Sequence, residues 1–356
     1  MMKFRGLRLF SIVVSLIFVL QAKTSFAASN EFVVNPLLPS GPDPWVEYKD
    51  GYYYFMRTTA TNLTIWKTRS MAELGSAEQK VVWIPPSTGP YSHDIWAPEI
   101  HFLRGRWYIY VAADAETNQT HRIYVLENAN ADPLQGEWRM KGKITDASDK
   151  WAIDASVFED QGVLYMIWSG WEGDENGTQS IYIARLSNPW TVQSKRTRIS
   201  TPEYPWEKVG DMPPQMAGGN PPHIDVNEGP EILIHGKKIF LTYSASACWT
   251  DNYALGMLTA VSGTDLLDPH SWTKSPHPVF QQSPENHVYA TGHNSFFKSP
   301  DGRDWLLYHA NPEHGQGCGW HRAPRAQPFT WNSDGTPNFG EPLSSETHIP
   351  WREGTH

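Results

Sequence analysis

The stretch DPWVEYKDGYYYFMRT, residues 43–58, reads as an alternating strand, a tight turn with a glycine and a second strand rich in aromatic residues. This pattern is typical of a β-hairpin. The same design returns in APEIHFLRGRWYIYVA (97–112), DASVFEDQGVLYMIWS (154–169), EGPEILIHGKKIFLTY (228–243) and HNSFFKSPDGRDWLLYHA (293–310). The first four hairpins read as equal in length, and the fifth turn is longer. The chain therefore repeats one hairpin five times.

A third strand follows most of these hairpins: NLTIWKTRS, RIYVLEN, SIYIARLSN and YALGMLTA are clear, and the fifth copy is weaker here. Small antiparallel sheets that repeat at such intervals are typical of the blades of a β-propeller. A β-sandwich with irregular loops is the competing architecture, but it does not require five matching hairpins. We predict an all-β protein, a five-bladed β-propeller.

The N-terminal sequence has the pattern of a targeting signal. Positive charges in MMKFRGLR precede the apolar run LFSIVVSLIFVL, and Ser25-Phe26-Ala27 has the small-x-small pattern of a cleavage site. The apolar run is too short to span a bilayer comfortably. We predict a signal peptide over residues 1–27 and a propeller domain over residues 28–356. The mature protein is expected to be secreted or periplasmic, with no membrane association after cleavage.

Charge and cysteine content narrow the possible partners. The formal net charge is −9 and no basic tract is present, which argues against a nucleic-acid partner. Cys248 and Cys318 are the two cysteines, and in an oxidising compartment they either pair or remain free thiols. We expect a monomer.

A shared position in the hairpins carries the candidate chemistry. Counting back eight residues from each turn glycine reaches Asp43, Ala97, Asp154 and Glu228, and in the fifth hairpin a position near His293 or Asn294. This position begins the strand that lines the central axis of a propeller. Three of the five blades would then direct a carboxylate into one axial pocket.

Taken singly, such acids are ordinary turn or strand-start residues, as in Asp43-Pro44. Gathered in one pocket, they cannot all remain ionised, so their pKa values spread apart and supply an acid and a base. Glycoside hydrolysis uses two carboxyls in this way. Metal binding is the rival use, but the sequence has no HExxH motif or close His/Cys spacing for catalytic zinc. Trp96, just before the second inner strand, either stacks on a sugar or fills a gap between blades.

These residues resemble glycoside hydrolase family 43, the five-bladed propeller hydrolases of arabinose- and xylose-containing plant polysaccharides. The resemblance runs from about Asn35 to the end of the chain. It is carried by five motifs in order, one for each blade: GPDPWV, WAPEI, AIDASVF, VNEGPEI and TGHNSF.

The resemblance implies a role for each acid. Asp43 would be the general base that activates water, and Glu228 the general acid that protonates the leaving oxygen. Asp154 would raise the pKa of Glu228 and orient it. The family inverts the anomeric configuration, so the base and acid should lie roughly 6.5–9.5 Å apart.

Further roles follow from the resemblance. His293 matches a residue that faces an axial metal ion, often calcium, in many relatives, so Ca²⁺ is expected as an optional ion and no cofactor as a requirement for the chemistry. Arg322, in GWHRAPRAQPF, resembles an arginine that reaches the sugar; the alternative is a surface ion pair. Glu99 and Glu231 lie off the shared register and are interpreted as structural residues.

The substrate is a finer inference. The stretches SASACWTDNYALGMLTA and RAPRAQPFTWNSDGTPNFGEP are most similar to the exo-acting α-L-arabinofuranosidases of this family, which act on arabinan or arabinoxylan. An endo-1,5-α-L-arabinanase and a β-xylosidase remain alternatives, and a non-catalytic sugar-binding propeller is an alternative of another class. The Pro/Gly-rich insert at 203–222 is expected to form a wall of the pocket.

Overall fold

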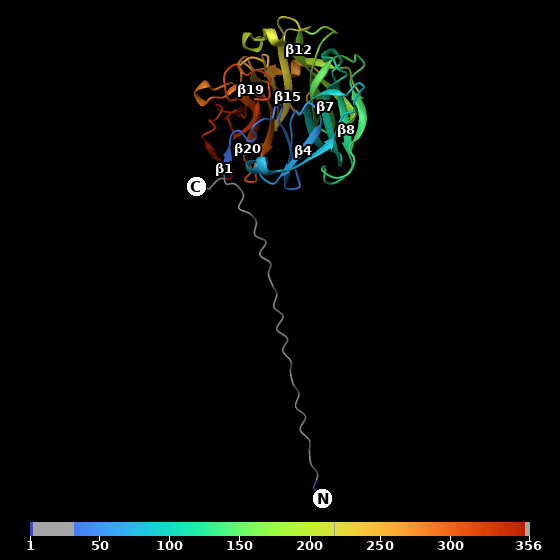
Figure 1. The fold of residues 1–356 in the computed structure, drawn as a ribbon, viewed down its shortest axis with the longest axis vertical. Coiled ribbons are helices and arrows are strands. Elements are labelled where there is room, and N and C mark those ends of the chain that lie inside the picture. Colours follow the sequence, from blue (N-terminus) through green and yellow to red (C-terminus); the bar gives the residue numbers. More distant parts are fainter. Residues whose placement is uncertain (3–31, 217, 353–356) are drawn as a thin grey trace.

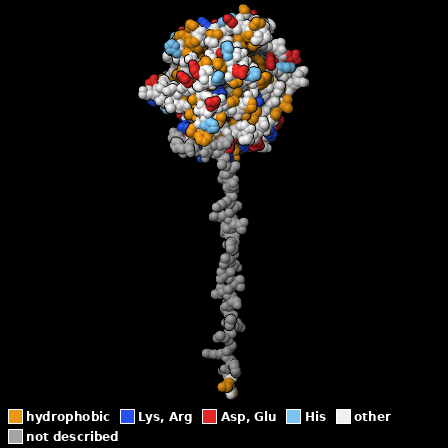
Figure 2. All heavy atoms as spheres, turned by 60° about the vertical axis from the view of Figure 1, so that its left-hand side comes forward, with side chains coloured by type: hydrophobic (Ala, Val, Ile, Leu, Met, Phe, Trp, Pro, Cys, Tyr) orange, Lys and Arg blue, Asp and Glu red, His pale blue; other side chains and the backbone are white. Residues whose placement is uncertain are grey.

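The computed structural model describes residues 1–2, 32–216 and 218–352 and consists almost entirely of β-strands (Figure 1). Beyond Met1 and Met2, the predicted signal peptide lies outside the described residues. Within them, no helix is long and apolar enough to cross a membrane. On the face seen in Figure 2, side chains of both charges are scattered among hydrophobic and uncharged ones.

Five antiparallel sheets follow one another along the chain. The first two contain β2 (Trp45–Lys49), β3 (Tyr52–Met56), β4 (Leu63–Thr68) and β5 (Glu78–Trp83), then β6 (His93–Leu103), β7 (Arg106–Asp114), β8 (Arg122–Asn128) and β9 (Arg139–Ile144). The third contains β10 (Ala152–Asp160), β11 (Val163–Gly170) and β12 (Thr178–Asn188), with β13 (Thr191–Val192) and β14 (Thr197–Ser200) on its edge.

The remaining strands complete the ring. The fourth sheet contains β15 (Asp225–His235), β16 (Lys238–Ala245), β17 (Ala254–Val261) and β18 (Thr273–Lys274), and β15 also pairs briefly in parallel with β12. The fifth contains β19 (Tyr289–Lys298), β20 (Asp304–Asn311) and β21 (Ala323–Pro328), followed by the small pair β22 (Thr330–Trp331) and β23 (Pro337–Asn338). Short 3-10 helices lie in the connections: η1 (Met71–Ser76), η2 (Asn118–Thr120), η3 (Pro205–Glu207), η4 (Pro214–Met216), η5 (Pro269–Ser271) and η6 (Pro284–Asn286).

The sheets close into a five-bladed propeller because each packs on the next. A buried hydrophobic cluster lies between every consecutive pair, and the last lies between the fifth sheet and the first. Each cluster contains residues of both sheets that it joins, for example the pairs Ile65 and Ile109, Val125 and Val157, Ile183 and Leu241, Leu255 and Leu306, and Phe55 and Trp305. The first strands of the sheets, β2, β6, β10, β15 and β19, contact one another in ring order. Burial of both sheet faces explains why these strands are so rich in aromatic and branched residues.

The N-terminal segment closes the ring. β1 (Phe32–Val34) pairs with β24 (His348–Pro350), so blue and red strands meet in Figure 1. Beyond β1, the backbone N–H of Leu37 donates to Pro324 O at 2.8 Å and that of Gly41 to Arg322 O at 2.9 Å. The N-terminal segment therefore borders β21, the third strand of the fifth sheet.

The turns correct one step of the sequence reading. In the first three hairpins a two-residue turn ends on the glycine, as in Asp50-Gly51, where both residues have positive φ and form the turn that suits a right-twisted hairpin. In the fourth hairpin His235 pairs with Lys238, so the glycine comes first in the turn. The equivalent position of that hairpin therefore lies seven residues before its glycine, and the count of eight from Gly236 is out of register.

The true equivalent position is marked by backbone conformation. One residue at or near the start of each inner strand has a φ between 44° and 56°: Asp43, Ala97, Asp154, Gly229 and His293. Except in the first sheet, where β2 begins only at Trp45, the residue lies in a β-bulge that interrupts strand pairing. Glu228 therefore lies one residue before the equivalent of Asp43 and shares its position with Trp96.

Candidate active site

Asp43, Asp154 and Glu228 nevertheless lie together at one end of the inner strands. We call these three acids the upper layer. Electrostatic interactions connect all three carboxyls, and Asp154 Oδ2 accepts the backbone N–H of Gly229 at 3.1 Å. Gly229 is needed there because a Cβ would meet the His293 ring at 3.1 Å and the φ is positive. The bulges re-aim the side chains and bring the acids from three sheets to one place.

Asp43 is held as a carboxylate by cationic and polar neighbours. Its Oδ1 lies 3.0 Å from Arg322 Nη1, 3.2 Å from His293 Nδ1 and 3.6 Å from His309 Nδ1. Thr58 Oγ1 donates to Oδ2 at 2.6 Å. Burial opposes ionisation, but these neighbours outweigh it, Arg322 most strongly, so the pKa of Asp43 falls below its usual value.

Glu228 has the opposite electrostatics. Its side chain is half-buried, and Tyr253 OH donates to Oε1 at 2.9 Å. Burial and then the negative charge of Asp43 raise the pKa of Glu228 to about 7, against the Tyr253 hydrogen bond and the charge of Arg322. Glu228 is therefore a carboxylic acid that can still carry its proton near neutral pH.

Asp154 is buried between these two acids, with 4% of its surface exposed. Burial raises its pKa well above the usual value, and repulsion from Glu228 and Asp43 adds to the effect. Because Asp154 and Glu228 interact strongly, they titrate as a pair, and ionisation of either disfavours ionisation of the other.

Glu99 and Glu231 are not off the axis, which corrects the sequence interpretation. Each lies two residues beyond the positive-φ position, so its side chain projects from the same face of the strand. Ser156 Oγ donates to Glu231 Oε2 at 3.1 Å across two sheets, and His101 Nε2 lies 3.0 Å from Glu99 Oε2. Together with His101, these two glutamates form a second, buried set of ionisable groups, which we call the lower layer.

The other predicted residues differ in how closely they approach the acids. Arg322 is mostly buried on Asp43 and so is not a surface ion pair. His293 also faces Asp43, and its backbone N–H donates to Ser244 Oγ at 2.7 Å. Trp96 is half-buried and stacks on His121 with ring centroids 4.1 Å apart, so part of its indole already has a protein partner.

The expected calcium finds little support in the donor set. No group of three or more His, Cys, Asp or Glu among the described residues is arranged to hold a metal ion. His293 Nδ1 points at a carboxylate that already carries the Arg322 guanidinium, and calcium prefers several oxygen ligands. The side chains present do not fit such an ion, and no chemical step is assigned to one.

Two further sequence features lie around the fourth sheet. Cys248 and Cys318 are joined in a disulfide that links the loop after β16 to the loop before β21. The insert at 203–222 is anchored beside β16, where the backbone N–H of Ala247 donates to Val209 O at 2.9 Å. Its role as a pocket wall stays a prediction.

Sequence reasoning missed three residues that shape this site. Thr58 accepts the backbone N–H of Ala97 while donating to Asp43, and so links the first two sheets. His309 Nδ1 accepts the backbone N–H of Asp43 at 3.1 Å, and Tyr253 holds Glu228. The one signal in the sequence was His309, a polar residue interrupting the apolar run of WLLYHA.

Comparison with known proteins shows the family of the chain. The sequence profile described as "Glycosyl hydrolases family 43" matches residues 33–337. The chain belongs to glycosyl hydrolase family 43. It is 40% identical over 331 residues to a protein of Streptomyces avermitilis named "Extracellular exo-alpha-(1->5)-L-arabinofuranosidase", and this match covers 90% of the chain and 66% of that protein.

Two other known proteins are similarly related. A protein of Streptomyces chartreusis with the same name is 40% identical over 282 residues, which cover 78% of this chain and 81% of that protein. The crystal structure of an α-L-arabinofuranosidase from Lactobacillus brevis superposes with a TM-score of 0.80 at 38% identity, covering 88% of this chain and 98% of that one. The chain spans just under two thirds of the length of the Streptomyces avermitilis relative.

Proposed function

We propose that this protein is an exported, inverting, exo-acting α-L-arabinofuranosidase that releases arabinose from arabinan or arabinoxylan. The observation that carries the proposal is the divergence of two pKa values: that of Asp43 is lowered, and that of Glu228 is raised to about 7. A pair of carboxyls with divergent pKa values is what a glycosidase needs at neutral pH.

In the proposed reaction, Asp43 accepts a proton from a water molecule while the oxygen of that water attacks the anomeric carbon. Glu228 donates its proton to the glycosidic oxygen as the bond to the leaving sugar breaks. Burial and the negative charge of Asp43 keep Glu228 protonated, Asp154 is assigned the role of modulating and orienting Glu228, and Arg322 keeps Asp43 ionised. The products are arabinose of inverted anomeric configuration and the shortened chain.

The choice of substrate and the export rest on the relatives. Two of them at 40% identity are named extracellular exo-α-(1→5)-L-arabinofuranosidases. The N-terminal sequence has the pattern of a signal peptide, which agrees with an exported enzyme.

Product analysis of linear 1,5-arabinan tests the proposal, with Asp43→Asn as the inactive control. Arabinose alone at the earliest time points supports exo action. A ladder of oligosaccharides would instead make the protein an endo-1,5-α-L-arabinanase with the same acids. If neither arabinan nor arabinoxylan gives a product and an aryl β-xyloside is hydrolysed, the protein acts on xylosides and the proposed substrate is wrong.

The non-catalytic alternative is tested by titration calorimetry. Binding of arabino-oligosaccharides without any product would make the protein a sugar-binding propeller. If Asp43→Asn digested arabinan as fast as the wild-type protein, the role given to Asp43 would be wrong.

A further inference from the structure

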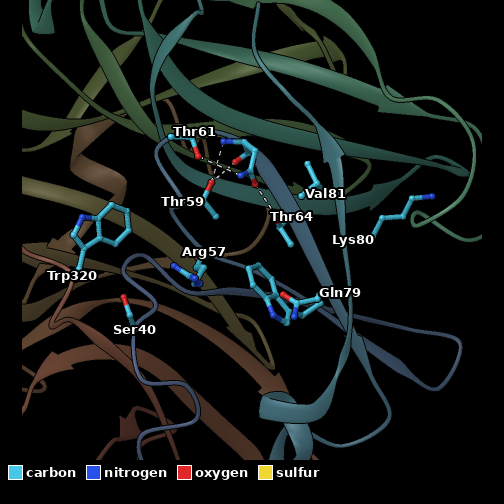
Figure 3. A pocket seen from close by; sticks show the side chains of 11 residues that line it. Ser40, Arg57, Thr59, Thr61, Thr64, Gln79, Lys80, Val81 and Trp320 are labelled. Atoms are coloured by element: carbon cyan, nitrogen blue, oxygen red, sulfur yellow. Dashed lines mark hydrogen bonds between the residues drawn. The ribbon is translucent and has the colours of Figure 1, made fainter.

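A cleft outside the acid cluster lies between the first and the fifth sheets (Figure 3). Its volume is about 560 Å³, within the range of small-molecule sites. Most of its lining comes from the end of β3, the β3–β4 loop, β4 and β5. Ser40 and Trp320 close it from the fifth-sheet side, so two distant segments form one cavity.

Trp320 is the clearest sign that the cleft binds a ligand. It is 55% exposed, more than any other tryptophan in the described part of the chain. Its loop is fixed by the Cys248–Cys318 disulfide two residues before it and by the contact of Arg322 with Asp43 two residues after it. An indole held in place at a cavity offers an apolar face to the C–H groups of a sugar and an N–H to its hydroxyls.

The lining of the cleft is largely polar. Ser40 and Arg57 belong to it, although Ser40 Oγ and Arg57 Nε themselves are buried below its surface and have no hydrogen-bond partner. A ligand in the cleft would therefore meet the exposed polar groups of the lining rather than these two atoms. Thr59, Thr61 and Gln79 add further hydroxyl and amide groups to the lining (Figure 3).

The charges of the cleft favour a neutral ligand. Arg57 Nη1 donates to Thr58 O at 3.2 Å, and its guanidinium lies 5.2 Å from the centre of the Trp66 ring. Lys80 Nζ donates to Leu134 O at 2.6 Å, and in Figure 3 its side chain points away from Trp320. Both cations already interact with the protein, so an acidic sugar would find little free positive charge.

We propose that this cleft is a second carbohydrate-binding site, which holds a neutral pentose chain of the polysaccharide while another part is cleaved. The inference rests on the proposed function. The cleft adjoins the upper layer through two connections, because Arg57 precedes Thr58, a donor to Asp43, and the residue after Ser40 donates its N–H to Arg322 O. Binding the polymer there raises the local concentration of its chain ends without taking part in bond cleavage.

Steady-state kinetics on two substrates test the site. Trp320→Ala and Gln79→Ala are compared with the wild-type protein on linear 1,5-arabinan and on an aryl α-L-arabinofuranoside, which is too short to reach both sites. The expected result for Trp320→Ala is a KM for arabinan raised roughly two- to tenfold, with kcat on arabinan and kcat/KM on the aryl glycoside unchanged within about twofold. Gln79→Ala should have a smaller effect of the same kind.

Tyr48→Ala is the matched control, because Tyr48 is an aromatic residue of similar exposure, 51%, near the turn end of β2.

Equal losses on both substrates for Trp320→Ala would mean that Trp320 acts through Arg322 and would overturn the proposal. So would an unchanged KM for arabinan. If the wild-type protein hydrolyses neither substrate, the proposed function fails, and calorimetric binding of arabino-oligosaccharides that is lost in Trp320→Ala alone would still support the cleft. A clear preference for oligogalacturonate with steep salt dependence would contradict a neutral ligand.

Discussion

The upper and lower layers of the axis both gather carboxyl groups away from water, yet their electrostatics differ. In the upper layer, Arg322 lies on one carboxyl and separates the pKa values, so that Asp43 stays ionised while Glu228 keeps its proton. In the lower layer, burial raises the pKa values of both Glu99 and Glu231 and lowers that of His101 to about 3. Burial alone therefore makes neutral groups, and a cation is needed to make an acid and a base from similar residues.

The largest expected difference between the layers is in turnover. Glu228→Gln removes the proposed proton donor and should lower kcat on arabinan by about 10²- to 10⁴-fold. Glu99→Gln removes a more deeply buried carboxyl of the lower layer and should cost less than about tenfold. Initial rates of arabinose release measure both, and circular dichroism checks that both variants are folded.

The leaving group sharpens this test. Glu228→Ala should keep more of its activity on an aryl glycoside with a good leaving group than on arabinan, because acid assistance matters less there. Equal losses on both substrates would count against Glu228 as the acid. A loss in Glu99→Gln as large as in Glu228→Gln would show that the two layers act as one unit.

Removing the cation should make the upper layer behave like the lower one. Arg322→Met takes away the strongest stabilisation of the Asp43 carboxylate, so the pKa of Asp43 rises. Asp43 must be ionised to act as a base, and the acidic limb of the kcat/KM profile should therefore move to higher pH. A lost hydrogen bond to a charged group costs roughly 1.5–3 kcal/mol, which is about ten- to a hundredfold in rate.

The matched control is Arg325→Met. Arg325 is a buried arginine of β21, and its Nη2 donates to Leu343 O at 2.6 Å, away from Asp43. Its loss should lower stability and leave the acidic limb in place. If the acidic limb does not move in Arg322→Met, the Arg322–Asp43 ion pair does not control the ionisation of Asp43.

The propeller was predictable from the sequence because local patterns specify it. Each hairpin carries its own alternation and turn glycine, and the repetition gives the blades. The register failed in the fourth sheet because a glycine can stand first or second in a two-residue turn, and counting from Gly236 cannot distinguish the two. The miscount still selected Glu228, because it landed one residue before Gly229. Gly229 occupies the bulge, and the Glu228 carboxyl beside it joins the other two acids.

The surroundings of the acids were not predictable in the same way. Arg322 and His309 lie 279 and 266 positions from Asp43 in the sequence, and only closure of the ring brings them to it. The lower layer was in principle predictable, because Glu99 and Glu231 lie two positions after the bulge residues and side chains two apart in a strand share a face. The bulge concealed this spacing from the sequence analysis, because it interrupts the strand alternation at the position from which the residues would be counted.

A smaller effect is expected from removing the Tyr253 hydrogen bond, which opposes protonation of Glu228. Tyr253→Phe keeps the ring, which packs against Gly292, and removes the hydroxyl that favours the ionised carboxylate. The pKa of Glu228 should rise above about 7, and the alkaline limb of the pH profile should move upward by up to about one unit. Tyr308→Phe is the control, because Tyr308 OH donates to Gln327 instead. A downward movement in Tyr253→Phe would mean that the Tyr253 hydroxyl accepts a hydrogen bond from protonated Glu228 instead of donating one to the carboxylate.

The smallest expected effect concerns the stability of the lower layer. Because the pKa values of Glu99 and Glu231 are raised in the folded state, folding favours their protonated forms. Their contribution to stability is present below the unfolded value of about 4.3 and is lost as pH rises toward the folded pKa values. Glu99→Gln and Glu231→Gln mimic the neutral form and cannot lose a proton, so relative to the wild-type protein their Tm should improve from pH 5 to pH 9 by a few degrees. A Tm difference that stays constant over this range would mean that the glutamates are ionised in the folded protein at pH 5. That would give the lower layer a compensating cation, and its contrast with the upper layer would disappear.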